Sequence, residues 1–360
     1  MRSYLFSIAA LLACGGYCSV EAGIYIPGLT PEITVKDGKA QAMPFDQIKI
    51  AFVDAINLAS GQQSKLGKEY EEACNRLLAK GVDNLDETEV AELSGREIRL
   101  RQLNRALELL RNAEKKFPNS FVIHSHLALV SHLQKDPEAP RLQLEASRMH
   151  PKQIPGLAAE QVPWALRLER LLFELERNRF REERDTGIQA SNESLDSILP
   201  ITFVGPSGQY EAGKISSEES TKIPEDALTA VQQLLLWLPD DIRLCWLLAE
   251  LYNAQGDISA ANFFFDYCAN KGFQPPLLRA HRRVVLEAAA AQPAAGFANL
   301  AERIPSGEKN AGKGNSWKDH PEAFVIVGSI VAVPLLVLIF WQIRLFARRL
   351  GAGGEYRAKT

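Results

Sequence analysis

The stretch that decides the fold runs from Asp240 to Cys268 and reads DDIRLCWLLAELYNAQGDISAANFFFDYC. Apolar residues recur in it every three or four positions on both sides of Gly256, and this is the period of an α-helix. Glycine commonly ends a helix because it adopts the left-handed backbone that closes the last turn. The stretch therefore predicts two helices joined by a tight turn.

Small and aromatic residues alternate along these two helices. Ala249 and Ala261 allow the helices to approach closely, and Tyr252 and Phe265 fill the wedge toward the next helix pair. In this pattern the stretch resembles a tetratricopeptide repeat. The signature positions of that repeat are occupied by Leu248, Ala249, Tyr252, Gly256, Asp257, Ala261, Phe265 and Cys268. The resemblance implies a solenoid of stacked helix hairpins.

Weaker copies of the pattern lie within residues 87–153 and 222–291. The first copy begins near Glu87 and contains Leu93, Ser94, Ala106, Leu110, Ala113 and Pro118, and the next contains Leu127, Ala128, Ala139, Ala146 and Pro151. These copies depart from the family because Glu97 and Ser131 replace the large wedge residue. Pro140 fits if its helix begins there, and a helix over 277–290 fits the terminal cap that such arrays need. Packed helices without true repeat geometry are the alternative.

Residues 154–221 do not follow the repeat and are predicted to be an insertion. Leucines among many Arg and Glu residues indicate one long charged helix that ends near Arg184. Residues 198–204 predict a strand, and a loop with Gly and Ser follows. From Gly208 to Ile215 this loop nearly matches a phosphate-binding loop, but Ile215 replaces the hydroxyl that would bind magnesium. A turn or hairpin is therefore favoured over a nucleotide site.

Before the repeats, residues 23–44 predict an extended arm that carries Pro and Gly. From Phe45 onward the period becomes helical. Ile48, Phe52, Ala55 and Ile56 form one apolar stripe, and Tyr70, Cys74, Leu77 and Leu78 form a second one after a break at Ser60 and Gly61. Two antiparallel helices therefore open a helical domain over residues 45–291. Pro and Gly in residues 292–321 indicate a flexible stalk after it.

The two ends of the chain predict its topology. Arg2 and about ten apolar residues after it match a secretory signal, so residues 1–22 are predicted to be cleaved after Ala22; lipidation at Cys14 and a buried helix are the alternatives. Residues 322–343 contain an uncharged run long enough to cross a bilayer of about 30 Å. Arginines follow in the tail 344–360, which the positive-inside bias places in the cytoplasm. The prediction is a single-pass membrane protein with its helical domain extracytoplasmic, in the periplasm of a Gram-negative cell.

The composition narrows the class of partner. The chain has 41 basic and 44 acidic residues and a formal net charge of −3. This balance lacks the broad basic field of a nucleic-acid binder. We therefore expect no nucleic-acid partner.

The residues that often carry chemistry do not assemble into a known signature. His124, His126 and His132 lie close in sequence, but the first two are two positions apart and point to different faces of a helix. Surface or groove histidines are therefore favoured over a metal site. After cleavage of the leader three cysteines remain. Of these, Cys245 and Cys268 lie on the two helices of the best repeat and are either small core residues or, in an oxidising compartment, a disulfide.

A helical repeat array presents a groove that its first helices line, and such grooves bind proteins. The predicted groove residues are Val122, Ser125, Leu129, His132, Arg243, Trp246, Glu250 and Asn253. Trp246 is the expected aromatic anchor, with Arg243 beside it; packing of Trp246 against a neighbouring helix is the alternative. The sequence thus predicts an all-α, membrane-anchored scaffold of tetratricopeptide type that binds a protein partner. It is expected to have no cofactor, no metal, no small-molecule substrate and no enzymatic activity. An accessory subunit of an envelope enzyme and a binder of envelope polymer are the alternatives.

Overall fold

The computed structural model describes residues 25–26, 34–36, 38–62, 64–186 and 194–291. The chain divides into a unit of residues 1–293 and a unit of residues 294–360, and all described residues belong to the first unit. These residues form twelve α-helices and one two-stranded hairpin. The prediction of an all-α fold is confirmed.

The four predicted segments at the ends of the chain lie outside the described residues. They are the signal peptide 1–22, the stalk 292–321, the membrane span 322–343 and the tail 344–360. In the part of the chain that the structure describes, no helix combines the length and the apolar character that crossing a membrane requires.

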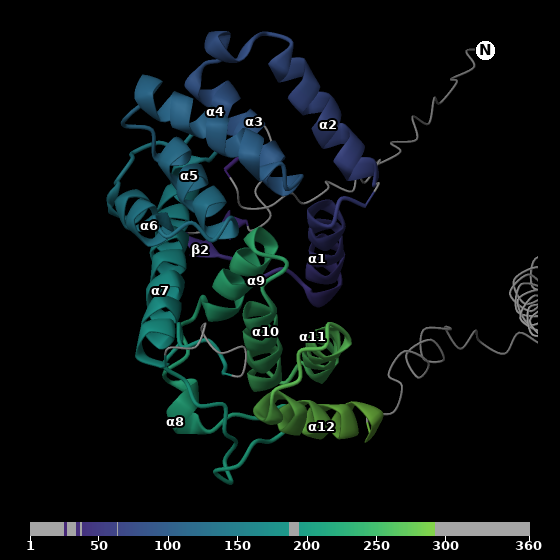
Figure 1. Cartoon of the computed structure of the whole chain (residues 1–360). Coiled ribbons are helices and arrows are strands. Elements are labelled where there is room, and N and C mark those ends of the chain that lie inside the picture. Colours follow the sequence, from purple (N-terminus) through teal and green to yellow (C-terminus); the bar gives the residue numbers. More distant parts are fainter. Residues whose placement is uncertain (1–24, 27–33, 37, 63, 187–193, 292–360) are drawn as a thin grey trace, which may run out of the picture. The chain divides into compact units, whose positions relative to one another are not determined.

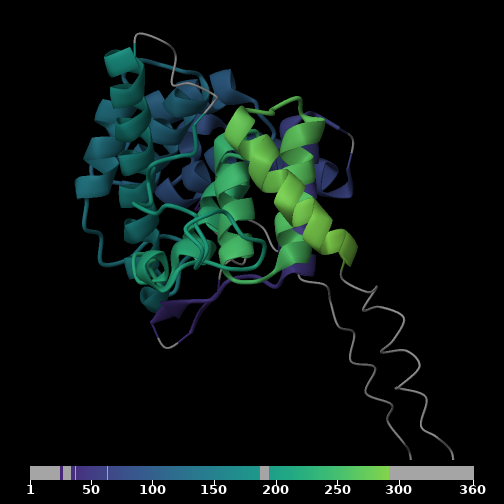
Figure 2. The ribbon, with the colours of Figure 1, turned by 90° about the horizontal axis from the view of Figure 1, so that it is seen from below.

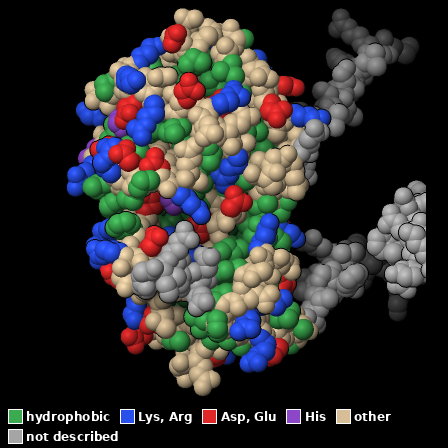
Figure 3. Space-filling view, in the orientation of Figure 1, with side chains coloured by type: hydrophobic (Ala, Val, Ile, Leu, Met, Phe, Trp, Pro, Cys, Tyr) green, Lys and Arg blue, Asp and Glu red, His purple; other side chains and the backbone are tan. Residues whose placement is uncertain are grey.

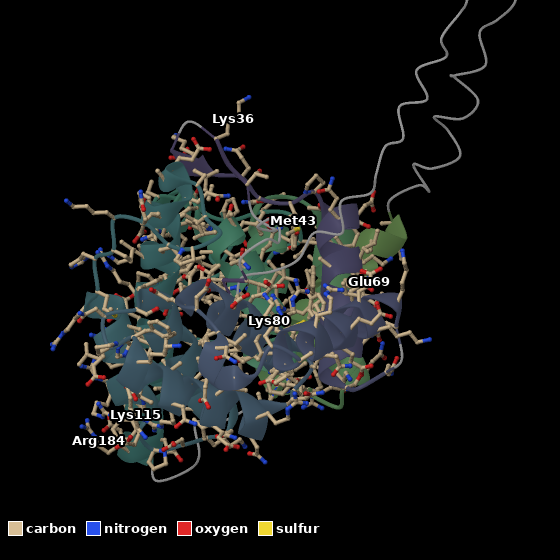
Figure 4. The ribbon with its side chains drawn as sticks, turned by 90° about the horizontal axis from the view of Figure 1, so that it is seen from above. Lys36, Met43, Glu69, Lys80, Lys115 and Arg184 are labelled. Carbon is tan, nitrogen blue, oxygen red and sulfur yellow. The ribbon has the colours of Figure 1, made fainter. Side chains whose placement is uncertain are left out.

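The N-terminal arm carries a short hairpin and is anchored to the helices. Strand β1 (Val35–Lys36) pairs antiparallel with β2 (Lys39–Ala40). Lys36 projects from the outer end of this hairpin, whereas Met43 lies within the fold (Figure 4). The Met43 backbone N–H donates to the Gln232 side chain at 2.9 Å, and Gln232 donates back to the Met43 carbonyl at 3.0 Å. The arm is therefore bound to a residue far along the chain.

Two helices follow the arm, as the apolar stripes predict. Helix α1 spans Phe45–Ala59 and helix α2 spans Lys65–Leu78. The Ser64 hydroxyl caps α2 by accepting the Gly67 backbone N–H at 2.9 Å. The buried Phe52 ring of α1 lies 4.9 Å from the ring of Tyr267, centroid to centroid. Helix α1 therefore packs against the C-terminal half of the described chain as well as beside its neighbour.

Sequential helix pairs form the middle of the unit. The helices are α3 (Glu87–Arg99), α4 (Leu103–Lys116), α5 (Phe121–Leu133) and α6 (Ala139–Arg148). Helix α3 contacts α4, and α5 contacts α6. A capping box between Asp86 and Glu89 begins α3, because each side chain accepts the backbone N–H of the other residue. Pro140 lies in the first turn of α6, where a missing N–H costs nothing.

The quoted stretch forms two packed helices, as predicted. The C-terminal helices are α9 (Ala227–Trp237), α10 (Ile242–Ala254), α11 (Ile258–Asn270) and α12 (Pro276–Ala291). Gly256 joins α10 to α11 with a φ of +84°, in the left-handed region that favours glycine. Ala249 and Ala261 have no exposed surface, which agrees with their expected role at the close approach of the pair. Helices α10, α11 and α12 lie side by side (Figures 1 and 2).

The insertion consists of one long helix and an irregular segment. Helix α7 spans Val162–Thr186, contacts α6 and α9, and lies below α6 on the left side of Figure 1. The prediction of a strand over residues 198–204 is wrong, because this segment pairs with no strand in the described chain. Instead, Ile201 and Val204 donate their N–H groups to carbonyls two residues back, and the Thr202 N–H donates to the Glu219 carboxylate at 2.8 Å. Hydrogen bonds to nearby carbonyls and to a side chain thus take the place of the hydrogen bonds that a neighbouring strand would provide.

Short elements complete the insertion and the connections. They are the 3₁₀ turns η1 (Val82–Asn84) and η2 (Ala159–Gln161) and the one-turn helix α8 (Ser217–Ser220). The glycine-bearing loop after residue 208 closes as a tight turn through an antiparallel bridge between Glu211 and Lys214. This agrees with the turn favoured from the sequence. In the described chain, buried apolar residues of every α-helix except α8 form one continuous cluster.

Candidate functional site

The eight predicted groove residues, which we call the inner face, lie on two helices. They are Val122, Ser125, Leu129 and His132 of α5 and Arg243, Trp246, Glu250 and Asn253 of α10. The structure buries this inner face instead of leaving it open. Val122, Trp246 and Glu250 have no exposed surface. Only His132 keeps a partly exposed side chain, at 22%.

Helix α7 covers the α5 part of the inner face through a buried carboxylate. Glu169 of α7 accepts a hydrogen bond from the Ser125 hydroxyl and another from the Gln143 side chain of α6. The Tyr25 hydroxyl of the arm donates to the same carboxylate at 3.1 Å. Burial raises the pKa of Glu169, and these three donors oppose the rise. The N-terminal arm and the consecutive helices α5 and α6 therefore converge on one side chain of α7.

About two turns further along α7, a second carboxylate meets the inner face. Glu176 is buried, and its carboxylate lies 3.0 Å from Nδ1 of His132. Glu169 and Glu176 are seven residues apart, so they lie on the same face of α7 as the buried Leu172. The face of α7 that enters the core thus carries acidic residues among its leucines.

Beyond Glu176, α7 meets the start of α10 through an arginine with two acidic partners. Arg179 donates to Asp196 at 2.6 and 3.0 Å and to Asp241 at 2.5 and 2.9 Å. Asp241 also caps α10 by accepting the Leu244 N–H at 3.1 Å. Although burial by itself would raise it, the pKa of Asp241 lies below its ordinary value because Arg179 stabilises the carboxylate. Arg179 therefore holds the insertion and the start of α10 together.

The predicted groove cation Arg243 belongs to the same cluster. Its guanidinium donates to Glu182 of α7 at 2.9 Å and lies 3.2 Å from the Asp196 carboxylate. Because its side chain is 4% exposed, Arg243 acts here as a structural partner of the insertion.

The predicted anchor Trp246 lies in the core. Its indole N–H donates to Glu250 at 2.7 Å, and Nδ1 of His281 on α12 lies 2.7 Å from the same carboxylate oxygen. The Tyr210 ring stacks on His281 with centroids 3.6 Å apart. The Trp246 side chain therefore has no exposed surface in this structure and packs within the fold.

The last inner-face residue, Asn253, holds the loop of the insertion. Its side-chain oxygen accepts the Gly213 N–H at 2.7 Å, and its amide group donates to the Glu211 carbonyl at 3.1 Å. This loop and α12 together cover the α10 part of the inner face. The groove that the sequence predicts is thus filled by the chain itself.

The three clustered histidines have separate surroundings. His124 contacts the Pro118 carbonyl at 2.9 Å, His126 contacts the Ser94 hydroxyl at 2.8 Å, and His132 faces α7. Among the described residues, no group of three or more His, Cys, Asp and Glu side chains is placed to hold a metal ion.

A cavity lies away from the inner face, where the arm meets the helices. It has a volume of about 580 Å³ between β2, the N-terminal end of α7 and the start of α9. Trp164, Arg167 and Asp226 line it, and the Arg167 guanidinium donates to both oxygens of the Asp226 carboxylate.

The surface charge does not single out a binding site. On the face of the molecule shown in Figure 3, charged side chains of both signs are interspersed, and no large patch of one sign is visible.

The sequence prediction includes Glu169, Glu176 and Arg179 only as charges of one long helix and does not identify them as buried partners of the inner face. A signal for their burial is present, since all three fall on the same helical face as Leu168, Leu172 and Leu175. Comparison with protein families, with curated proteins and with solved structures yields no match for this chain.

The buried Glu97 of α3 gives a testable pH dependence. Burial raises its pKa from 4.5 to about 7, against the opposing effect of Arg105. Between pH 4.5 and about 7 the folded state binds the Glu97 proton more strongly than the unfolded chain does. The free energy of unfolding therefore falls as the pH rises through this range. Replacing Glu97 with glutamine should therefore raise the free energy of unfolding at pH 8 by up to about 3 kcal/mol and leave it unchanged at pH 4. Denaturant unfolding at the two pH values measures this.

The matched control is Glu108→Gln, on the exposed side of the adjacent helix. We expect this change to alter stability by less than about 0.5 kcal/mol at either pH. An equal gain for the Glu97 variant at pH 4 and pH 8 would contradict the assignment.

Proposed function

We propose that this chain is a membrane-anchored, extracytoplasmic scaffold of tetratricopeptide type that binds a protein partner. The observation that carries the proposal is the sequential pairing of helices, above all α10 with α11. In that pair the small residues Ala249 and Ala261 are buried at the positions that the repeat signature requires. Arrays of such pairs present extended surfaces that suit protein binding.

The filled inner face specifies how the partner would bind. Glu169, Glu176 and Asn253 engage polar groups within the chain. A partner that uses the predicted groove would therefore bind beside α7 or replace its contacts. His132 is the partly exposed member of the inner face, and we propose it as the residue closest to such a partner.

Membrane anchoring and partner binding are tested in one experiment. A photo-crosslinking amino acid is placed at position 132 in the full chain, and cells are irradiated before their membranes are washed with alkaline carbonate. The chain should stay in the washed membranes because a spanning helix of about twenty residues resists carbonate. We expect a discrete crosslinked protein, identified by mass spectrometry. The control carries the probe at Glu69, an exposed residue of α2.

The two readouts fail separately. Release of the full chain into the carbonate supernatant would refute the anchor. Retention of the chain with the same crosslinking pattern from positions 132 and 69 would refute binding near the inner face.

A further inference from the structure

Two cysteines face each other between α10 and α11. The Cys245 thiol donates to the carbonyl oxygen of Phe264, with Sγ and O 3.7 Å apart. The Cys268 thiol donates to the carbonyl oxygen of Ile242 over the same distance, 3.7 Å. Both cysteines are fully buried and are free thiols in this structure.

The two carbonyls locate the sulfur atoms relative to each other. Phe264 precedes Cys268 by four residues, so its carbonyl lies one helical turn away on the same side of α11. Ile242 precedes Cys245 by three residues and lies on the same side of α10. Each thiol therefore reaches the part of the opposite helix that carries the other cysteine. This reciprocity places the two side chains across from each other.

We propose that Cys245 and Cys268 form a disulfide when the chain folds under oxidising conditions. The bond would join α10 to α11, the pair that contains the repeat signature. Disulfides persist in extracytoplasmic compartments, so the occurrence of this one in cells rests on the proposed export of the domain. The capacity of the two cysteines to form the disulfide does not depend on that export.

The oxidant is another disulfide, either oxidised glutathione or the active-site disulfide of a thiol oxidase. One cysteine thiolate attacks a sulfur of the oxidant, forms a mixed disulfide and releases one thiol. The second thiolate attacks the protein sulfur of that mixed disulfide, which forms the bond between Cys245 and Cys268 and releases the second thiol. Two electrons pass to the oxidant, and the two cysteine protons end on the released thiols.

Burial determines when this exchange occurs. Burial raises the pKa of the Cys245 thiol well above its ordinary value, and the adjacent Cys268 adds to the rise. The folded, reduced protein therefore holds little of the thiolate that attacks disulfides. The exchange belongs to folding, before the helices close over the sulfurs.

The test is oxidative refolding of the full chain in detergent with a mixture of reduced and oxidised glutathione. The product is alkylated in denaturant and digested with trypsin. Both cysteines fall in one tryptic peptide, Leu244–Lys271, because no Lys or Arg lies between its ends. We expect this peptide to be unalkylated and two hydrogen atoms lighter, while Cys74 is alkylated. A second cleavage after Glu250 should give two pieces that separate only after reduction.

Cys268→Ser is the matched variant, and in it Cys245 should be fully alkylated. The oxidised wild-type chain should melt roughly 6–12 °C above this variant. Complete alkylation of both cysteines after oxidative refolding would overturn the proposal. The same peptide analysis on protein from cells tests export separately. A disulfide that forms on refolding but is absent from cell-derived protein would count against the proposed compartment and not against the pair.

Discussion

Replacing Arg179 with alanine is expected to lower the free energy of unfolding by about 3–5 kcal/mol, because it leaves the buried Asp241 without its arginine and leaves Asp196 with Arg243 alone. Asp196 and Asp241 both receive two hydrogen bonds from Arg179, and their side chains are 2% and 11% exposed. Removal of the guanidinium places two negative charges close together in a region from which water is largely excluded. Chemical denaturation of the full chain, followed by circular dichroism, measures the loss.

Two controls separate this ion cluster from a general effect of shortening a side chain. Arg184→Ala removes an exposed arginine of the same helix and should cost less than about 0.5 kcal/mol. Adding Asp196→Asn and Asp241→Asn to the Arg179→Ala chain should restore at least half of the loss, because asparagine removes the charge and still caps α10. A loss of equal size at Arg179 and Arg184 would show that the cluster does not hold α7 in place.

The second large effect is expected at Trp246. Its side chain is fully buried and packs on Phe273 with ring centroids 6.0 Å apart. Truncation to alanine leaves a cavity that surrounding side chains fill only in part, so we expect a loss of about 3–5 kcal/mol in the free energy of unfolding. Thermal unfolding of the full chain, followed by its helical circular dichroism signal, should show a lower midpoint.

Phe180 provides the comparison, since it is a large aromatic residue of α7 that is 57% exposed. Phe180→Ala should change stability by less than about 0.5 kcal/mol. A Trp246→Ala chain with unchanged stability but impaired partner capture would instead favour the groove anchor predicted from the sequence.

The helices of this protein could be predicted because their apolar residues have a helical period. Ile48, Phe52 and Ala55 form a stripe that is buried as expected, and Gly256 divides α10 from α11 as its backbone freedom suggests. These features are local, so neighbouring residues suffice to specify them. The expected strand over residues 198–204 failed because strand formation needs a partner segment, which the local sequence does not reveal.

The candidate site could not be predicted for a related reason. Ser125, His132 and Arg243 are polar, and a polar helix face usually contacts water or a partner. In this fold their partners are Glu169, Glu176 and Glu182, which lie several tens of residues away in sequence. A repeat pattern describes contacts between adjacent helices and contains no information about a long helix that returns over them. The polar residues of the inner face therefore have two possible kinds of partner, another protein or a distant segment of the same chain, and the local sequence does not distinguish them.

The bonds of the N-terminal arm bear on the order in which the protein is completed. Tyr25 donates to Glu169, which is 144 positions later, and Met43 pairs with Gln232, which is 189 positions later. The arm thus leaves the ribosome well before its partners in α7 and α9 are made. Ordinary repeat arrays fold outward from any repeat, each stabilised by its neighbours. Here the arm is tied to α7 and α9, so an unfinished chain leaves buried polar groups unpaired, and the described unit should melt in a single cooperative transition rather than in successive steps.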